Sequence, residues 1–283
     1  MIQQGLFEGI INGAILALIS MGITLVWGVM NILSFSQGEF LMLGMFVSFY
    51  LNRYFGIDPI IALPFSALSL YILGYLIYKL IIVKALNGPK LSQRLITFAL
   101  SMVLINFALL IFGGDFKTIQ NISISGSYDL GWLIVPKQKL YPFVIALVIA
   151  GSMFFFLNKT KQGKAIQATA MDKYAASLVG IDTDRVYANS FALSSAIAGA
   201  AGCALTYYYY IFPQGGQNFQ LFGFIAVTMG GFGSVFGAFL GGLIMGIVDV
   251  MTGIYLNTAF KYLGVCIAFL VIVSFRPKGI LGK

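Results

Sequence analysis

The stretch NGAILALISMGITLVWGVMNILSFSQGEFLMLG (Asn12–Gly44) contains a single charged residue, Glu39. Its apolar part is long enough to cross the roughly 30 Å hydrocarbon core of a bilayer, which takes about 20 residues of helix. The segment Ser34–Gly44 then interrupts the apolar run with Ser, Gln, Gly and the carboxylate. The sequence therefore begins with a predicted membrane helix that ends in a polar interruption.

The composition of the whole chain extends this prediction. The 283 residues are 59% hydrophobic and 9% charged, far from the averages of soluble domains. Lipid allows only helices and closed barrels to cross it, and the uncharged runs are too long for barrel strands. We therefore predict an all-α fold, a polytopic integral membrane helical bundle of about eight transmembrane segments, eight or nine crossings in all, forming a single transmembrane domain over residues 1–283. The uncharged runs are Gly9–Gly38, Phe40–Asn52, Pro59–Tyr78, Leu95–Gly114, Leu140–Asn158, Val186–Val248 and Tyr262–Phe275.

The positive charges predict the orientation of these segments. The net charge is +8, but most Lys and Arg residues stand at the edges of the apolar runs, which argues against a nucleic-acid partner. By the positive-inside rule, the three basic segments are cytoplasmic. The loop Asp115–Lys139 then lies outside, and so does the N-terminus if both earlier segments cross. The basic segments contain Lys79, Lys84, Lys90 and Arg94; Lys159, Lys161, Lys164, Lys173 and Arg185; and Arg276, Lys278 and Lys283.

A glycine-rich segment in the second half matches the interruption in the first. Three hydrophobic blocks lie between Arg185 and Arg276, and an odd number of crossings cannot return the chain to the cytoplasm. The middle block, Phe219–Val250, must therefore cross twice or not at all. It contains TMGGFGSVFGAFLGGLIMG, with seven glycines from Gly230 to Gly246.

Interrupted hydrophobic segments in both halves of a membrane protein indicate a substrate path, because unwound backbone is tolerated at depth only where it lines a cavity or is buried in protein. The alternative for the second segment is that its small residues only let helices pack closely. The predicted substrate-path residues are Ser34, Ser36, Gln37, Gly38, Glu39, Gly230, Gly231, Gly233 and Gly237.

Glu39 has two interpretations. An ionisable residue in a membrane segment is a functional candidate because its burial is costly. Ser36 and Glu39 also fit the capping box S-x-x-E, in which the Ser hydroxyl accepts from the Glu amide and the carboxylate reaches back to the Ser amide. We favour the cap, which is compatible with a path because the amide dipoles of a discontinuous helix would face it.

The largest polar segment is NKTKQGKAIQATAMDKYAASLVGIDTDR (Asn158–Arg185), within residues 158–186. Its Ala-rich centre, Lys164–Val179, predicts a short helix that ends at Gly180, a residue suited to a C-cap. A helix covered with small side chains would fit a socket on another protein. The alternative is an ordinary helix that rests on the membrane surface.

Several segments together resemble a known family. GKAIQATAMDKYAASLVGID followed by SFALSSAIAGAAG resembles the cytoplasmic loop and next helix of the permease subunits of branched-chain amino-acid ABC importers, the LivH type in particular. The N-terminal stretch, GGFGSVFGAFLGGLIMG and FRPKGILG resemble that family's opening, glycine-rich later helix and C-terminal signature, in the same order. Where the family usually has N-F-A-H-G-E, this chain has Ser34, Ser36 and Gln37 in place of Asn, Ala and His.

The resemblance implies a permease subunit of an ATP-driven importer that translocates leucine, isoleucine and valine across the bacterial cytoplasmic (inner) membrane. The implied partners are a second homologous permease subunit, two cytoplasmic ATPase subunits, an extracytoplasmic substrate-binding protein and membrane lipid. The cytoplasmic loop would couple this chain to an ATPase, although Gln167 stands where the family usually has Arg. The implied coupling residues are Gly163, Ala165, Ala168, Ala170, Asp172, Ala175, Ala176 and Gly180.

The sequence contains no G-x-x-x-x-G-K-S/T motif, so ATP hydrolysis is expected on separate subunits and the chain is not predicted to be an enzyme. Without His or clustered Cys, no metal site and no cofactor are predicted. Two alternatives stay open: a urea or short-amide importer permease of the same family, and a stand-alone secondary transporter or channel.

Overall fold

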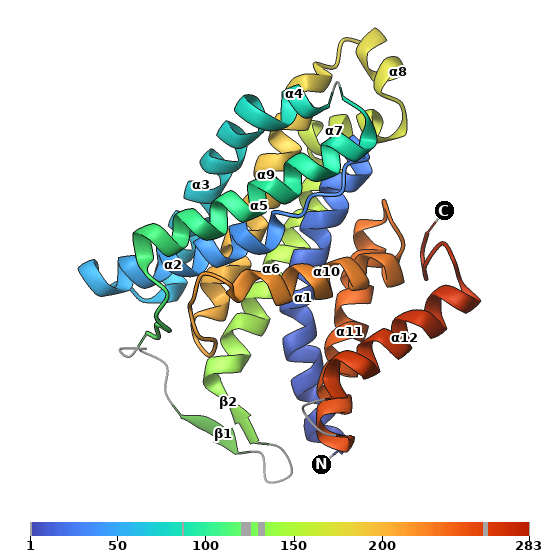
Figure 1. The fold of residues 1–283 in the computed structure, drawn as a ribbon. Helices are drawn as coiled ribbons and strands as arrows, with labels where there is room; N and C mark the ends of the chain where they lie inside the picture. Colours follow the sequence, from blue (N-terminus) through green and yellow to red (C-terminus); the bar gives the residue numbers. More distant parts are fainter. Residues whose placement is uncertain (1, 87, 120–125, 130–133, 257–259, 283) are drawn as a thin grey trace.

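The computed structural model describes residues 2–86, 88–119, 126–129, 134–256 and 260–282, and these form a helical bundle with one small β-hairpin (Figure 1). The elements are α1 (Ile2–Met30), α2 (Gln37–Phe55), α3 (Pro59–Ile77), η1 (Tyr78–Ile82), α4 (Val83–Ala85), α5 (Lys90–Phe112), β1 (Ser127–Asp129), β2 (Ile134–Pro136), α6 (Lys137–Lys159), α7 (Lys161–Met171), α8 (Lys173–Leu178), α9 (Thr183–Leu205), α10 (Gly215–Gly230), α11 (Val235–Tyr255) and α12 (Lys261–Phe275).

Six helices in the described part of the chain are long and apolar enough to cross a membrane: α1, α3 with its continuation to Ala85, α5, α6, α9 and α11. Helix α12 is apolar but has only 15 residues, which reach about 22 Å as a helix. The polytopic helical bundle is confirmed, whereas the number of about eight segments stays a prediction.

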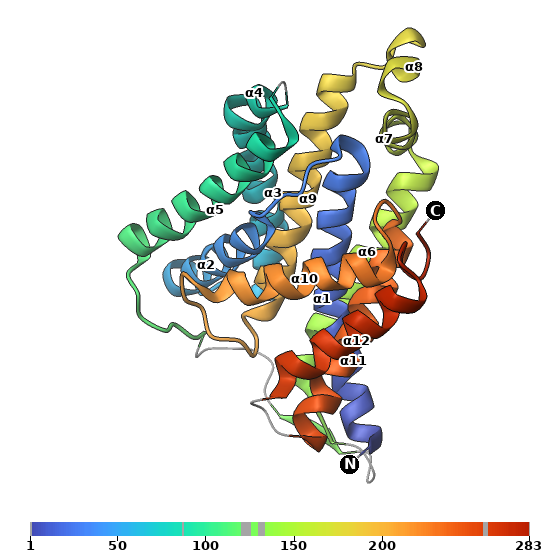
Figure 2. The same cartoon turned by 45° about the vertical axis from the view of Figure 1, so that its right-hand side comes forward.

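The charge pattern predicts that the two ends of the bundle face opposite sides of the membrane. The N-terminus lies at the same end as β1 and β2, and helices α4, α7 and α8 lie at the opposite end (Figures 1 and 2). Most of the predicted basic residues stand at or near this second end, which we therefore describe as the inner end. The centre of the predicted outer loop, residues 120–125 and 130–133, lies outside the described residues.

Helices α1 and α11 pack through small residues. A side chain on Gly242 would collide with the backbone of Ala17, and one on Gly246 would collide with the backbone of Gly13. Gly9 has the same relation to the backbone of Ile247. Because lipid provides little hydrophobic drive between helices, such close backbone approach is a main source of association energy in membranes. This part of the glycine-rich segment therefore packs helices together.

Both predicted interruptions are present. Helix α1 ends at Met30, Asn31 has a left-handed backbone (φ 55°), and α2 begins at Gln37, as predicted for a segment that must start near Ser36. In the second half, the block that had to cross twice or not at all is divided into α10 and α11. The break contains Gly231 (φ 105°) and Gly233 (φ 84°), a conformation that favours glycine.

Candidate translocation and coupling sites

The first interruption lies inside the bundle. The side-chain oxygen Oε1 of Gln37 is 3.9 Å from the position that a Cβ on Gly22 would occupy, so α2 begins level with Gly22 of α1. Gly22 precedes the inner end of α1, Met30, by eight residues, or about 12 Å of helix. The chain thus turns back into the protein after α1, and α2 starts at depth and lies across the direction of α1, as does α10 (Figures 1 and 2).

One residue from the second half holds this start of α2. Gln220 of α10 accepts a hydrogen bond from the Gly38 amide at 2.6 Å and donates one to the Ser34 carbonyl at 3.1 Å. Gly38 and Gly216 lie so close that a side chain on either would collide with the backbone carbonyl of the other. The N-terminal ends of α2 and α10 therefore meet, and the carboxamide of Gln220 joins them.

The carboxylate of Glu39 lies at this meeting point. Its Oε1 accepts a hydrogen bond from the Ser101 hydroxyl of α5 at 2.7 Å, and its Oε2 is 2.8 Å from the position of a Cβ on Gly216. The N-terminus of a helix carries partial positive charge, which stabilises a nearby carboxylate. Two such termini converge here, and this provides a physical reason for an acid in this apolar region.

The predicted capping box is wrong. Ser36 is the N-cap residue of α2, but its side chain makes no capping hydrogen bond; its hydroxyl pairs with that of Ser34 at 3.1 Å. The Glu39 carboxylate binds Ser101 and does not reach back to Ser36. A capping box leaves the Gly38 amide without an acceptor. Here this amide donates a hydrogen bond to the side chain of Gln220. Partners from α5 and α10 have replaced the local pattern.

The first group of predicted path residues is buried and incompletely paired. Ser34, Ser36, Gln37 and Glu39 are almost fully buried. Both polar side-chain atoms of Gln37 and Oε2 of Glu39 have no hydrogen-bond partner among the residues that the structure describes. Such unpaired atoms are costly in an apolar interior, which marks the start of α2 as a place where polar groups are kept for a reason other than packing.

The second group of predicted path residues lies elsewhere. Gly230 and Gly237 pack against each other at the break between α10 and α11, and Gly233 lies beside Gly28 of α1. The carbonyl oxygens of Met229 and Gly230 accept hydrogen bonds from the amides of Ile280 and Leu281, at 2.9 and 3.0 Å. The C-terminal segment thus closes over this break near the inner end. The residues that meet the first interruption are Gly216 and Gln220, which the sequence prediction missed.

The loop that was predicted to be cytoplasmic forms two helices, where one helix was predicted. Thr160 caps α7 by accepting from the Gly163 amide at 3.0 Å. Asp172 ends α7 and caps α8, accepting from the amides of Tyr174 and Ala175 at 2.8 and 3.0 Å. An Asp side chain competes for backbone donors and favours a helix start over a helix interior. Gly180 follows α8 with φ 85°, as predicted for its C-terminal end.

The predicted coupling residues differ in exposure. Gly163 and Ala176 are buried, Ala165 and Ala168 are half-buried, and Ala170, Asp172, Ala175 and Gly180 are exposed. A side chain on Gly163 would collide with the backbone of Phe156 and Leu157 in α6, so this glycine fixes the loop to its own bundle. Gln167 has a similar role, because its amide donates to the Leu157 carbonyl at 3.2 Å.

Large apolar side chains cover the tip of this loop. Met171 is 89% exposed, Tyr174 74%, Leu178 70% and Val179 76%. The sequence prediction concentrated on small residues and missed these four, although M-D-K-Y and L-V interrupt the Ala-rich pattern. We call Met171, Tyr174, Leu178 and Val179 the α8 patch.

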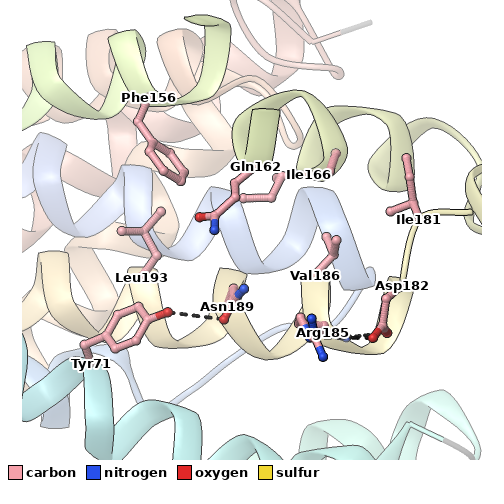
Figure 3. A pocket seen from close by; sticks show the side chains of 11 residues that line it. Tyr71, Phe156, Gln162, Ile166, Ile181, Asp182, Arg185, Val186, Asn189 and Leu193 are labelled. Atoms are coloured by element: carbon pink, nitrogen blue, oxygen red, sulfur yellow. Dashed lines mark hydrogen bonds and ion pairs between the residues drawn. The ribbon is translucent and has the colours of Figure 1, made fainter. Parts of the chain in front are cut away.

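A cavity of about 370 Å³ separates α7 from α3 and α9 (Figure 3). On one side it is lined by Gln162 and Ile166 of α7, and on the other the Tyr71 hydroxyl donates to Asn189 at 3.2 Å. The loop is therefore anchored at the end of α6 and spaced from the helices opposite. Among the residues that the structure describes, no group of three or more His, Cys, Asp or Glu could hold a metal ion.

Comparison with known proteins identifies the family. Residues 5–275 match the model of the family described as "Branched-chain amino acid transport system / permease component". The high-affinity branched-chain amino acid transport system permease protein LivH of Escherichia coli (strain K12) is 28% identical over 99% of this chain and 95% of its own length. The probable branched-chain amino acid transport permease protein LivH of Methanocaldococcus jannaschii is 29% identical over 99% and 93%.

A more distant relative, the high-affinity branched-chain amino acid transport system permease protein LivM of Escherichia coli (strain K12), is 21% identical over 99% of this chain and 71% of its own length. No solved structure matches the chain. The family match, the apolar spans and the two interrupted segments agree with one another. This chain is a multi-pass inner-membrane protein and belongs to the family of branched-chain amino acid transport system permease components.

Proposed function

We propose that this chain is the membrane permease subunit of an ATP-driven importer that carries leucine, isoleucine and valine into the cytoplasm. The observation that carries the proposal is the match to the permease family over residues 5–275, with LivH relatives that align over nearly their whole length. The chain forms one transmembrane permease domain. ATP is hydrolysed on separate ATPase subunits, and this chain supplies the passage.

The passage runs past the start of α2. Three observations support this position: α2 begins at depth, the carboxamide of Gln220 joins the two interrupted halves there, and the polar atoms of Gln37 and Oε2 of Glu39 are buried without described partners. Discontinuous helices of this kind provide backbone and polar side chains at the substrate site of many transporters. Ser34, Ser36 and Gly38 complete this part of the path.

The glycines at the second break belong to the inner end of the same passage. Gly231 and Gly233 adopt positive φ, and Gly230 and Gly237 pack in direct contact. The C-terminal segment closes this break through two backbone hydrogen bonds, and Leu281 is 41% exposed and Ile280 only half-buried, so the segment can detach at a small cost. The break therefore suits an inner gate.

The coupling element is the loop of α7 and α8, residues 158–186. The α8 patch supplies an apolar contact surface at the inner end, and exposed apolar residues of this size mark sites of protein association. Gly163 and Gln167 fix the loop to α6, so a force on α8 is transmitted to the bundle. The partner at this surface is a cytoplasmic ATPase subunit.

The second permease subunit is a homologue of this chain. The two E. coli relatives, LivH and LivM, are each named as a permease protein of a high-affinity branched-chain amino acid transport system, and both align with this chain over 99% of its length. An extracytoplasmic binding protein delivers substrate to the pair, and two ATPases bind the inner end.

Uptake measurements test the proposal. A strain that lacks this gene should lose most uptake of labelled leucine at low concentration and regain it when the gene is restored, and excess isoleucine or valine should compete. Excess urea or acetamide should not compete. Normal leucine uptake in the deletion strain, or competition by urea alone, would contradict the proposed substrate.

A further inference from the structure

A second cavity, of about 280 Å³, lies among α1, α10, α11 and α12. It is close to the lower limit of about 300 Å³ for pockets that bind small molecules. Asn12, Leu16, Leu205, Phe219, Phe222 and Tyr262 are among the residues that line it. Asn12 belongs to the outer half of α1 and Leu205 ends α9 at its outer end, so the cavity lies on the side from which substrate arrives.

An ion pair forms one wall of this cavity. Asp249 of α11 and Lys261 of α12 line it, and their charged atoms are 3.7 Å apart. The Asp249 side chain is 16% exposed and that of Lys261 34%. Charged groups in membrane helices are costly and are usually retained for function. At 3.7 Å the pair is longer than a well-formed charge-assisted hydrogen bond of about 2.8 Å, so each charge retains binding capacity.

Gly253 of α11 makes space for the side chain of Lys261, and we call this space the lysine seat. A Cβ on Gly253 would be 2.6 Å from Cε and 3.4 Å from Cγ of Lys261, so the aliphatic stem of the lysine lies along α11 where glycine leaves space. This seat directs the ammonium group toward Asp249, one turn earlier on α11. The two charges are thereby held side by side at one edge of the cavity.

The rest of the cavity is neutral. Ile15, Leu16, Leu205, Phe219 and Phe222 provide apolar wall. The Tyr262 hydroxyl donates to Asn218 at 3.2 Å and fixes α12 to α10 beside this wall.

Two tyrosines that follow α9 also line the cavity. Burial raises the pKa of the Tyr208 hydroxyl and that of Tyr209, so both hydroxyls stay neutral. Asp249 and Lys261 are therefore the formal charges among the described lining residues.

We propose that this cavity is an amino-acid site, in which the carboxylate of Asp249 binds the α-ammonium of the substrate, the ammonium of Lys261 binds its α-carboxylate, and the apolar wall holds its branched side chain. Adjacent opposite charges complement a zwitterion, and an adjoining apolar wall excludes polar side chains. The inference rests on the proposed function and adds a receiving site at the outer side of the passage.

Binding to the importer purified through a tag on this chain, without its binding protein, tests the site. Three ligands isolate the two charges: leucine, isoamylamine, which lacks the carboxylate, and 4-methylpentanoate, which lacks the ammonium. The wild-type complex should bind leucine at least about tenfold more tightly than either analogue, as expected for loss of one charged hydrogen-bonding group.

The variants then assign each charge. Lys261→Gln should weaken leucine binding by about tenfold or more and should not weaken isoamylamine binding, because the cation that competes for Asp249 is lost. Asp249→Asn should weaken leucine binding equally and should not weaken 4-methylpentanoate binding, because the anion that competes for Lys261 is lost. Lys139→Gln, which breaks the 3.1 Å ion pair with Glu8 elsewhere at the outer end, is the matched control and should bind all three ligands like the wild type.

A purely structural ion pair gives a different result. It predicts that each variant changes the affinity for all three ligands by the same factor, or changes none, and either outcome would overturn the proposal. If the single variants do not fold, the double variant Asp249→Lys with Lys261→Asp restores the pair. This double variant should regain the wild-type thermal midpoint. It should still bind leucine weakly, because the two charges are exchanged while the apolar wall stays in place. Wild-type leucine affinity in this variant would overturn the site.

The two proposals fail separately. Absence of leucine transport by the complete wild-type importer, with its binding protein, would refute the proposed function. Leucine transport by the wild type together with unchanged leucine binding in both charge variants would refute only the site.

Discussion

The side-chain oxygen of Gln220 lies 2.6 Å from the amide nitrogen of Gly38, across 182 residues of chain. Gly38 is in the first turn of a helix that begins inside the protein, where backbone amides have no acceptors of their own. The same carboxamide donates to the Ser34 carbonyl on the other side of the break. A single side chain of the second half therefore holds both sides of the interruption in the first.

Replacement of Gln220 should destabilise the protein. Gln220→Leu leaves the buried Gly38 amide and Ser34 carbonyl without these partners, at a cost of about 1–3 kcal/mol for each unsatisfied group. The thermal midpoint of the solubilised permease should fall, and transport should fall with it. Gln217→Leu, the same change at an exposed position of α10, is the control and should leave the midpoint within error. Equal midpoints for the two variants would contradict the role of Gln220.

The contact between Gly38 and Gly216 should tolerate no side chain. Gly216→Ala places a methyl group against the Gly38 carbonyl and near the Glu39 carboxylate, so α2 and α10 must separate. We expect a loss of about 1–3 kcal/mol from overpacking and a transport rate well below that of the wild type. Gly151→Ala in α6 is the control, because nothing lies within 4 Å of the added methyl group. That variant should be neutral or slightly stabilised.

Asp172 should control the order of α8 without affecting the membrane helices. Asp172→Ala removes the acceptor for the Tyr174 and Ala175 amides, a loss of about 1 kcal/mol for a helix N-cap. Hydrogen exchange should accelerate in residues 173–178 and stay unchanged in α9. Asp172→Asn keeps an acceptor and should retain most of the protection. Unchanged exchange in Asp172→Ala would show that α8 is stabilised in another way.

The α8 patch should be required for ATPase association. The double variant Tyr174→Ser with Leu178→Ser removes apolar surface and adds no charge, so fewer ATPase subunits should co-purify with the permease. The thermal midpoint of the permease alone should not change, because both side chains are exposed. Lys161→Ser with Lys164→Ser removes exposed side chains from α7 of the same loop and should co-purify normally. Wild-type recovery of ATPase with the α8 variant would exclude the patch as the docking surface.

Much of the architecture could be predicted because lipid restricts the choices. Long apolar runs predict helices because backbone groups in lipid have no water to bind. The positive-inside rule then predicts the orientation of each helix in the membrane. Glycine and serine in long apolar runs predicted both breaks, at Ser36 and near Gly231, for the same reason: no membrane helix of ordinary length fits the run.

The partners at the first break could not be predicted in the same way. The S-x-x-E pattern is local, and it predicted a cap that Ser101 and Gln220 replace from α5 and α10. Which distant side chain reaches a helix start depends on packing that no short pattern contains. A signal existed, since Gln220 directly precedes the apolar LFGFIAV, where a polar group needs a buried partner.

The coupling loop shows a different error. Alanine content predicted one helix through Asp172, but the competition of an Asp side chain for backbone amides outweighs small differences in helix propensity. The Asp249–Lys261 pair escaped prediction because Asp249 ends one apolar run and Lys261 precedes the next. Each residue, considered alone, therefore looked like the charged end of a membrane helix.

The closure of the second break by the C-terminal segment sets an order for biogenesis. The carbonyls of Met229 and Gly230 accept hydrogen bonds from the amides of Ile280 and Leu281, which follow α12 and are therefore synthesised after α10 and α11. During membrane insertion, the break between α10 and α11 therefore stays without these two hydrogen bonds until the segment after α12 has been synthesised. A chain truncated after α12 would contain all the membrane helices that the structure describes and still lack these two donors, and quality-control proteases could recognise such a chain by its open break.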